Sequence, residues 1–212
     1  MTSHLKVVAH PAGSYPPRTR YNASLADLTV AFAIDFSSPG ERLTRTAAAS
    51  RYVAIHFSDG PAAGAATLIS ALRDHQCRTL NVAGHSLQTL LRHGVSESAC
   101  NEYVHRVLSE ALKVWPVGRV VSGGQTGVDL AGAVSASVLG IEAELTLPAG
   151  FLQRDAQGRD AQHTEAEIRE HVAVMAEALR VAVDPLVERE AVDATTDPHP
   201  QAAGSVRSRM RM

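Results

Sequence analysis

Residues able to bind an anion gather in one short stretch, Ser122 to Asp129, which reads Ser-Gly-Gly-Gln-Thr-Gly-Val-Asp. Apolar β-branched residues precede it and predict a buried strand, and helical apolar spacing follows it from Thr126. A glycine turn between a strand and a helix can adopt positive φ and leaves room for a ligand. The start of a helix carries free N–H groups and partial positive charge, which suit phosphate. The candidate ligand-binding residues of this turn are Ser122, Gly123, Gly124, Gln125, Thr126, Gly127 and Asp129.

The same turn has a purely structural interpretation. Thr126-x-x-Asp129 has the spacing of a capping box, in which both side chains satisfy N–H groups at the start of a helix. A carboxylate at this position would repel a phosphate unless it contacts a ribose hydroxyl or a metal ion. The turn matches neither G-x-x-x-x-G-K-[ST] nor G-x-G-x-x-G, so spacing alone leaves a ligand site and a scaffold turn equally open.

The string at Ser122 to Asp129, followed by a small-residue helix and Leu139-Gly140-Ile141, resembles the molybdenum carrier family. That family belongs to the wider group of Rossmann-like domains related to the cytokinin-activating, lysine decarboxylase-like proteins. Leu147 to Phe151 is similar to the Pro-x-Gly segment that the family carries one strand later. The resemblance covers about Arg119 to Asp160 of the 212 residues.

Two upstream segments resemble other parts of the same family. Gly60 to Thr67 is similar to its Gly-Pro-x-x-Gly-Gly-Thr turn, and Arg18 to Asn22 is similar to its Arg-Thr-x-Trp-Asn segment. In the family both follow the Gly-Gly-Gln-Thr-Gly turn, whereas here they precede it, which implies a circularly permuted or rearranged relative. Arginines in a proline-rich loop could also clamp a phosphate bidentately. These segments add Gly60, Gly64, Thr67, Arg18 and Arg20 to the candidate ligand-binding residues.

The sequence offers fewer candidate catalytic residues than candidate ligand-binding residues. Hydrolases of the wider group carry a Pro-Gly-Gly-x-Gly-Thr-x-x-Glu motif whose Glu serves catalysis, but this chain has Ser70 at the matching position. The carboxylates that could replace it are Asp35, Asp59 and Asp129. An Asp at the end of a strand is also ordinary turn chemistry. His10 and His85 could form an acid–base pair or ligate a metal ion, although scattered histidines without ligand spacing usually do neither.

The rest of the chain predicts an α/β fold. Six apolar segments alternate with helical ones, which favours a Rossmann-like, doubly wound, mostly parallel sheet with helices on both faces. The expected strands are Leu5–Ala9, Leu28–Ile34, Tyr52–Phe57, Arg78–Ala83, Arg119–Ser122 and Glu142–Leu147. The last alternates Glu with apolar residues, which indicates an edge strand. Ligands of such sheets bind at the carboxyl ends of the strands.

The helical segments follow from apolar spacing and capping residues. The expected helices are Glu41–Ala49, Ala65–His75, one capped by Ser86 and ending at Leu91, Glu97–Val114, one from Thr126, and one opened by the Thr164-x-x-Glu167 capping box and ending near Val183. The prolines and glycine of His10 to Arg20 predict a loop. We expect one domain at 1–185 and a disordered tail at 186–212, which lacks a sustained apolar pattern.

Net charge and cysteine content limit the classes of binding partner and the cellular compartment that we expect for this protein. The net charge of -2 predicts neither a nucleic-acid nor a membrane partner. Cys77 and Cys100 lack the spacing of a zinc site and fit a reducing compartment, and no apolar signal segment is evident. We therefore expect a cytoplasmic protein with a small phosphorylated ligand, and a homo-oligomer stays open.

Three functions are compatible with these patterns. The first is binding of a nucleotide or a nucleotide-like phosphorylated cofactor, such as the molybdenum cofactor, at the two glycine turns. The second is hydrolysis of the N-glycosidic bond of a nucleoside monophosphate, a phosphoribohydrolase-like reaction. The third is an interaction module with a vestigial site. Because Ser70 stands in place of the catalytic Glu, the sequence favours the first.

Overall fold

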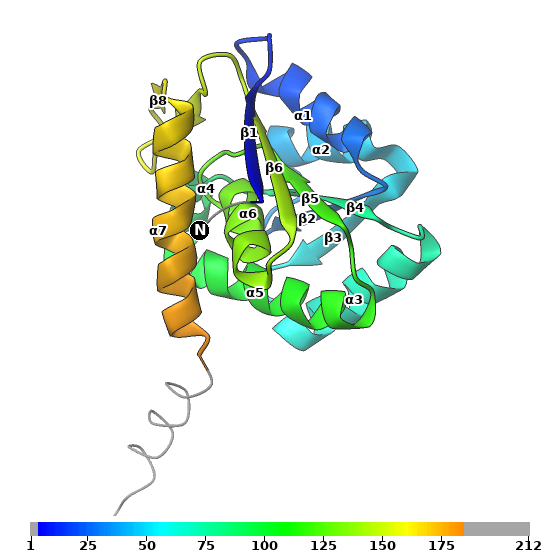
Figure 1. Ribbon diagram of the computed structural model, residues 1–212. Helices are drawn as coiled ribbons and strands as arrows, with labels where there is room; N and C mark the ends of the chain where they lie inside the picture. The colour runs from blue at the N-terminus through cyan, green and yellow to red at the C-terminus, as the bar shows by residue number, and fades with distance from the viewer. Residues whose placement is uncertain (1–3, 185–212) are drawn as a thin grey trace, which may run out of the picture.

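A six-stranded parallel sheet forms the centre of the molecule (Figure 1). The computed structural model describes residues 4–184. The strands are β1 (Leu5–Ala9), β2 (Leu28–Ala33), β3 (Tyr52–His56), β4 (Thr79–Gly84), β5 (Arg119–Ser122) and β6 (Glu142–Leu147), and their order in the sheet is β1-β6-β5-β4-β2-β3. The predicted α/β fold with a doubly wound parallel sheet is confirmed. The predicted tail, 186–212, lies outside the described residues.

Helices cover both faces of the sheet. They are α1 (Tyr15–Leu25), α2 (Pro39–Ala48), the short 3-10 helix η1 (Ala49–Arg51), α3 (Pro61–Asp74), α4 (Leu87–Arg92), α5 (Glu97–Val114), α6 (Val128–Leu139) and α7 (Glu165–Ala182). Parallel connections are right-handed, so the direction in which the chain moves along the sheet decides the face of each helix. The chain moves one way through β1, β2 and β3 and then returns through β4, β5 and β6. Helices α1 and α2 therefore pack together on one face, and α3, α5, α6 and α7 form the layer on the other.

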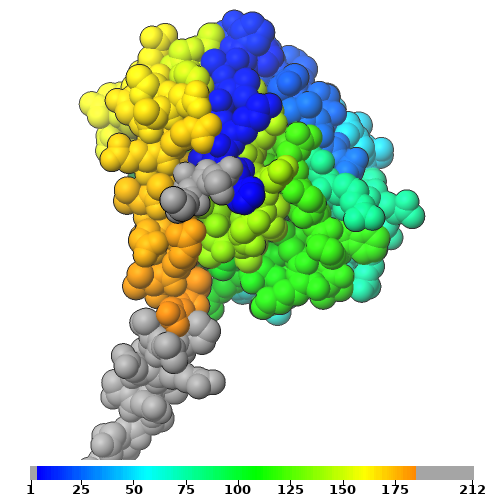
Figure 2. All heavy atoms as spheres, viewed as in Figure 1, coloured from blue at the N-terminus to red at the C-terminus, as the bar shows by residue number. Residues whose placement is uncertain are grey.

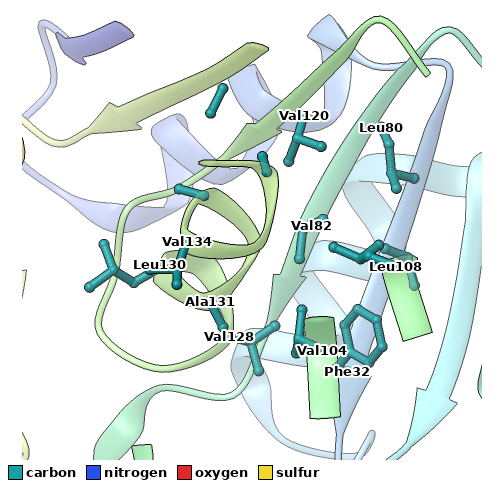
Figure 3. Close-up of a cluster of buried hydrophobic side chains, with 14 of the residues drawn as sticks. Phe32, Leu80, Val82, Val104, Leu108, Val120, Val128, Leu130, Ala131 and Val134 are labelled. Atoms are coloured by element: carbon teal, nitrogen blue, oxygen red, sulfur yellow. The ribbon is translucent and has the colours of Figure 1, made fainter. Parts of the chain in front are cut away.

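The core lies between the sheet and the larger helical layer. Figure 3 shows Phe32, Val82 and Val120 of the strands facing side chains of α5 and α6, all of them buried. All six residues of β2 are buried, because a central strand covered on both faces has no side exposed to water. With only 4% aromatic residues, the chain builds this core mostly from aliphatic and small side chains.

Helix α1 contradicts the loop predicted from His10 to Arg20. The helix starts at Tyr15, and Pro16 and Pro17 occupy its first turn. Proline breaks a helix interior because it has no N–H, but the first-turn N–H groups have no helical partner in any case. The prolines therefore begin a helix here instead of interrupting one.

The edge position predicted for Glu142–Leu147 is also wrong, because β6 lies between β1 and β5. Its Glu144 is buried, and the carboxylate accepts hydrogen bonds from Lys6 Nζ at 3.3 Å and Arg119 Nη1 at 3.4 Å. Each neighbouring strand supplies one of these cations. A glutamate inside a sheet is thus tolerated because both neighbours compensate its charge.

Three other helix starts differ from the prediction. Helix α2 begins at Pro39, two residues before the predicted Glu41. Helix α3 begins at Pro61, four residues before the predicted Ala65, and α6 begins at Val128 with Gly127 as its N-cap. The predicted α7 is confirmed. Its Thr164–Glu167 capping box is present, and its apolar stripe, Ile168, Val172, Met175 and Leu179, is buried.

The segment between β6 and α7 closes one end of the sheet. It contains a small antiparallel hairpin, β7 (Gln153–Arg154) and β8 (Asp160–Ala161). Helix α7 then packs against β1, so that the first strand and the last helix lie side by side at the surface (Figure 2). No helix within residues 4–184 has the length and apolar character needed to cross a membrane.

Candidate functional site

A pocket of about 330 Å³ opens between α1, the start of α2 and the carboxyl ends of β4 and β5. The neighbouring strands β4 and β2 send their following helices to opposite faces of the sheet at this point. Doubly wound sheets bind ligands at such a reversal of strand order, because the diverging loops leave a crevice. The volume lies at the small end of the usual range of ligand pockets, about 300–1,000 Å³.

A buried ion pair, Arg18 with Asp129, joins α1 to the first turn of α6 and forms the part of the pocket lining that we call its floor. Arg18 Nη1 donates to Asp129 Oδ2 at 2.9 Å, and the two side chains are 9% and 7% exposed. Burial raises the pKa of the Asp129 carboxyl, and the neighbouring Arg18 charge opposes that rise. Because both charges are removed from water, each depends on the other for compensation.

Gly123 makes room for this ion pair. A Cβ at this position would lie 1.6 Å from Arg18 Nη1 and 2.2 Å from Asp129 Oδ2. Gly124 is constrained differently, because its φ is +67° and a Cβ there would lie 2.7 Å from the Leu147 side chain. Gly123 therefore lines the pocket, whereas Gly124 faces β6.

The side chains of the turn do not form the predicted capping box. Thr126 Oγ1 donates to the backbone oxygen of Arg154 at 2.5 Å, and α6 has no side-chain cap. The prediction is wrong because Asp129 is engaged by Arg18 and Thr126 by the β7–β8 hairpin. Ser122 Oγ donates to the Asp129 backbone oxygen at 2.7 Å, and Gln125 Oε1 accepts the Arg154 N–H at 2.9 Å.

Backbone groups at the start of α6 are also used within the protein. Val128 N donates to His85 O at 3.1 Å, and Leu130 N donates to Gln125 O at 3.0 Å. Gly127 has a φ of +97°, and a Cβ there would lie 2.5 Å from the Leu87 backbone nitrogen. The loop that leads into α4 thus packs directly on this turn.

Glu41 and His85 meet elsewhere in the lining of the same pocket. Glu41 Oε1 lies 3.5 Å from His85 Nδ1, and each side chain is 3% exposed. His85 Nε2 accepts the backbone N–H of Asp35 at 3.1 Å. Since Nε2 acts as an acceptor, the ring hydrogen lies on Nδ1, the nitrogen that is 3.5 Å from Glu41 Oε1. The sequence did not single out Glu41, because an acid in the first turn of a helix is commonplace.

Four buried side chains around this one pocket keep a polar atom without a hydrogen-bond partner among the described residues. The atoms are Arg18 Nε, Asn22 Oδ1, Glu41 Oε2 and Asn81 Oδ1, and their residues are between 2% and 7% exposed. Buried polar groups almost always have a partner, so each exception calls for an explanation. Their concentration in the wall of one pocket favours a polar ligand.

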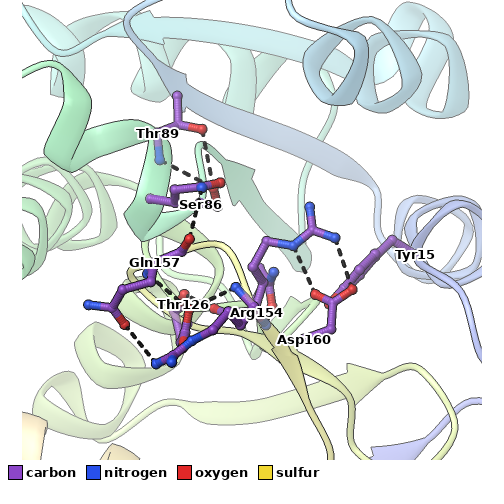
Figure 4. Close-up of polar contacts among 11 residues, drawn as sticks. Tyr15, Ser86, Thr89, Thr126, Arg154, Gln157 and Asp160 are labelled. Atoms are coloured by element: carbon purple, nitrogen blue, oxygen red, sulfur yellow. Dashed lines mark hydrogen bonds and ion pairs between the residues drawn. The ribbon is translucent and has the colours of Figure 1, made fainter.

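The rim of the pocket is built by the hairpin and the start of α1 (Figure 4). Arg154 donates to both carboxylate oxygens of Asp160, at 2.8 and 3.0 Å, and its guanidinium lies 5.2 Å from the centre of the Tyr15 ring. Tyr15 Oη donates to Asp160 at 2.9 Å. Burial and the hydrogen bond to Asp160 raise the pKa of Tyr15 to about 12, and the hydrogen bond from Arg154 lowers the pKa of Asp160.

The second predicted turn lies at the same sheet edge but away from the pocket. Gly60, Gly64 and Thr67 follow β3, an outer strand that β2 and β4 separate from β5, and they do not line the pocket. Gly64 packs on the side chains of Ile55 and Val107. The turn that does reach the pocket is the start of α2, from Ser38 to Thr44.

Of the remaining candidate site residues, some line the pocket and others do not. Asp35 and Asp59 are exposed and bind their own turns, Asp35 through Ser37 and Asp59 through the His56 N–H. Arg20 is exposed and does not line the pocket, in contrast to Arg18. Of the three candidate catalytic carboxylates, Asp129 alone lines it.

Metal ligands and thiols are the other groups of the described chain that could carry chemistry. No cluster of three or more His, Cys, Asp or Glu side chains that could hold a metal ion occurs in residues 4–184. Cys77 and Cys100 are buried free thiols, and burial raises the pKa of Cys77 to about 12. Both thiols are therefore poor nucleophiles at neutral pH.

No protein-family model matches the chain, and a search of curated proteins finds no match. The resemblance to the molybdenum carrier family therefore stays a prediction.

Proposed function

We propose that the protein binds a small phosphorylated ligand of the nucleotide type in the pocket between α1, α2 and the turn after β5. The observation that carries this proposal is the set of four buried polar side chains, each with an unpaired atom, around one pocket at the reversal of strand order. The pocket volume of about 330 Å³ favours a mononucleotide over a dinucleotide. The two buried free cysteines favour a reducing, cytoplasmic setting.

The charges at the pocket suggest how such a ligand lies. Arg154 at the rim is 38% exposed and can exchange Asp160 for a phosphate, which guanidinium groups bind bidentately. The N-terminal turn of α2 adds partial positive charge from Ser38 to Gly40. The molybdenum cofactor implied by the family resemblance also combines a phosphate with N–H donors, and the same residues would hold it.

The test compares two arginines of one hairpin by calorimetry with a panel of nucleoside monophosphates and inorganic phosphate. Arg154→Gln is expected to weaken nucleotide binding by about tenfold or more, the usual effect of losing a hydrogen bond to a charged group. Arg159→Gln removes an exposed arginine that pairs with Asp155 outside the pocket, and affinity should not change. Equal binding by both variants, or no binding of any nucleotide by the wild type, would contradict the proposal.

A second candidate function is hydrolysis of the N-glycosidic bond of a nucleoside monophosphate. Glu41 favours this function. The hydrolase motif carries its catalytic Glu where this chain has Ser70, and the buried carboxylate of Glu41, which has an unpaired oxygen, could take the place of that Glu. A buried carboxylate at a ligand pocket can stabilise the positive charge that develops on a ribose ring as the bond breaks. Chromatography after incubation would detect the released base, and Glu41→Gln should abolish its release. Intact nucleotides after long incubation would leave binding as the function.

A further inference from the structure

We propose that Glu41 selects the ligand: its free carboxylate oxygen accepts a hydrogen bond from an uncharged donor of the bound nucleotide, a hydroxyl or an amine, and His85 holds the carboxylate in place. This inference rests on the proposed function and names the chemistry of the end of the ligand that lies opposite its phosphate.

The contacts of His85 leave it one role. Its Nε2 accepts the Asp35 N–H at 3.1 Å, so its hydrogen lies on Nδ1, 3.5 Å from Glu41 Oε1. Both ring nitrogens are thus engaged with the protein. His85 is a positioning residue, which fixes one oxygen of Glu41 and leaves Oε2 without a partner.

Two amide side chains that line the same pocket, Asn81 and Asn22, also keep an unpaired oxygen. Asn81 Nδ2 donates to Thr29 Oγ1 at 3.2 Å, and Asn22 Nδ2 donates to the Thr146 backbone oxygen at 3.5 Å. With their nitrogens used in this way, both side chains keep an oxygen as the unpaired atom. Three residues that line one pocket thus keep an unpaired buried acceptor oxygen, which calls for a hydrogen-bond donor, and a phosphate dianion has none.

The distribution of charges around the pocket also favours an uncharged donor near Glu41. Arg18 is paired with Asp129 and Arg154 with Asp160, whereas the contact of Glu41 is with a neutral imidazole. A buried carboxylate without a cation repels an anionic group and favours a neutral or cationic donor. The phosphate therefore lies toward Arg154 and the donor-bearing end toward Glu41.

The experiment measures selectivity by calorimetry with adenosine 5′-monophosphate, its 2′-deoxy analogue and inosine 5′-monophosphate. The deoxy analogue lacks a sugar hydroxyl, and the inosine nucleotide lacks the base amine, so the two arms distinguish the source of the donor. The wild type should prefer the adenosine nucleotide over one analogue by about tenfold or more, the effect of losing a hydrogen bond to a charged group. Glu41→Gln should remove most of that preference.

Glu97→Gln is the matched control. Glu97 also has an unpaired buried oxygen, but it lies on α5 outside the pocket, so its variant should keep the wild-type preference. An unchanged preference in Glu41→Gln, or equal affinity of the wild type for all three nucleotides, would overturn this inference and leave nucleotide binding in place. A wild type that binds none of them would overturn the proposed function and this inference together.

A pair of His85 variants tests the positioning role. Asn places its amide nitrogen near the site of Nδ1 and keeps a donor for Glu41, whereas Gln reaches the site of Nε2 and keeps only the contact with the Asp35 N–H. His85→Asn should therefore retain the nucleotide preference that His85→Gln loses. Equal loss in both variants would mean that His85 only fills space.

Discussion

The floor and the rim of the pocket each contain an arginine–carboxylate pair, but the two pairs lie in different surroundings. At the floor, Arg18 and Asp129 are 9% and 7% exposed, whereas at the rim Arg154 and Asp160 are each 38% exposed. Breaking a buried pair leaves a charge without compensation, while water screens an exposed one. The residues that look most like a binding motif therefore hold the fold together, and residues without any motif form the entrance.

Asp129→Asn should have the largest effect on stability. The variant leaves the Arg18 charge buried without a counter-charge, and the free energy of unfolding should fall by about 3–5 kcal/mol. Urea denaturation at neutral pH measures this loss. The double variant Arg18→Met/Asp129→Leu removes both charges and should recover much of it. A stable Asp129→Asn protein would remove the distinction between floor and rim.

Gly123→Ala should have the next largest effect. The new methyl group would overlap Arg18 Nη1 and Asp129 Oδ2, and the loss should be about 1–3 kcal/mol, as for other overpacked sites. Gly60→Ala is the control, because a Cβ there meets no atom within 4 Å. Its expected cost is about 1 kcal/mol or less, for an N-cap glycine. Equal melting temperatures for the two variants would mean that the ion pair moves aside freely.

Asp160→Asn should have the smallest effect, within about 1 kcal/mol, because its pair is exposed. The hydrogen bond from Arg154 lowers the pKa of Asp160 in the folded protein below the ordinary value of 3.8. The folded state therefore binds this proton less tightly than the unfolded state, and the stabilisation is present above pH 3.8. It should disappear as the pH falls through the lowered value. Denaturation of wild type and variant across this range measures the difference, and a gap that widens in acid would contradict the assignment.

The sequence predicts the fold better than the site, because apolar spacing is a local signal. Each of the six predicted strands occurs, since its apolar run is visible within a few residues. The pocket is a non-local result of strand order. Asn22, Glu41 and Asn81 follow no common spacing, and they meet because the chain reverses direction along the sheet and places β2 beside β4.

The two glycine turns show the same limit. Gly60–Gly64 and Gly123–Gly127 look alike as sequence, and each leads from a strand into a helix. Their difference lies in their neighbours, because the first follows an outer strand and the second a central one beside α1. Arg18 was identified by its residue type, but its partner Asp129 is 111 positions away and no sequence pattern joins them.

The position of β1 has a consequence for the order in which the molecule forms. This strand is synthesised before β6, with which it pairs, and the contact of Lys6 with Glu144 spans 138 positions. Contacts between such distant segments form slowly, because a long loop must close before they contribute. Until β6 and the β7–β8 hairpin leave the ribosome, β1 lacks the strand with which it pairs and Arg154 cannot complete the pocket. The pocket is therefore among the last features that a nascent chain acquires.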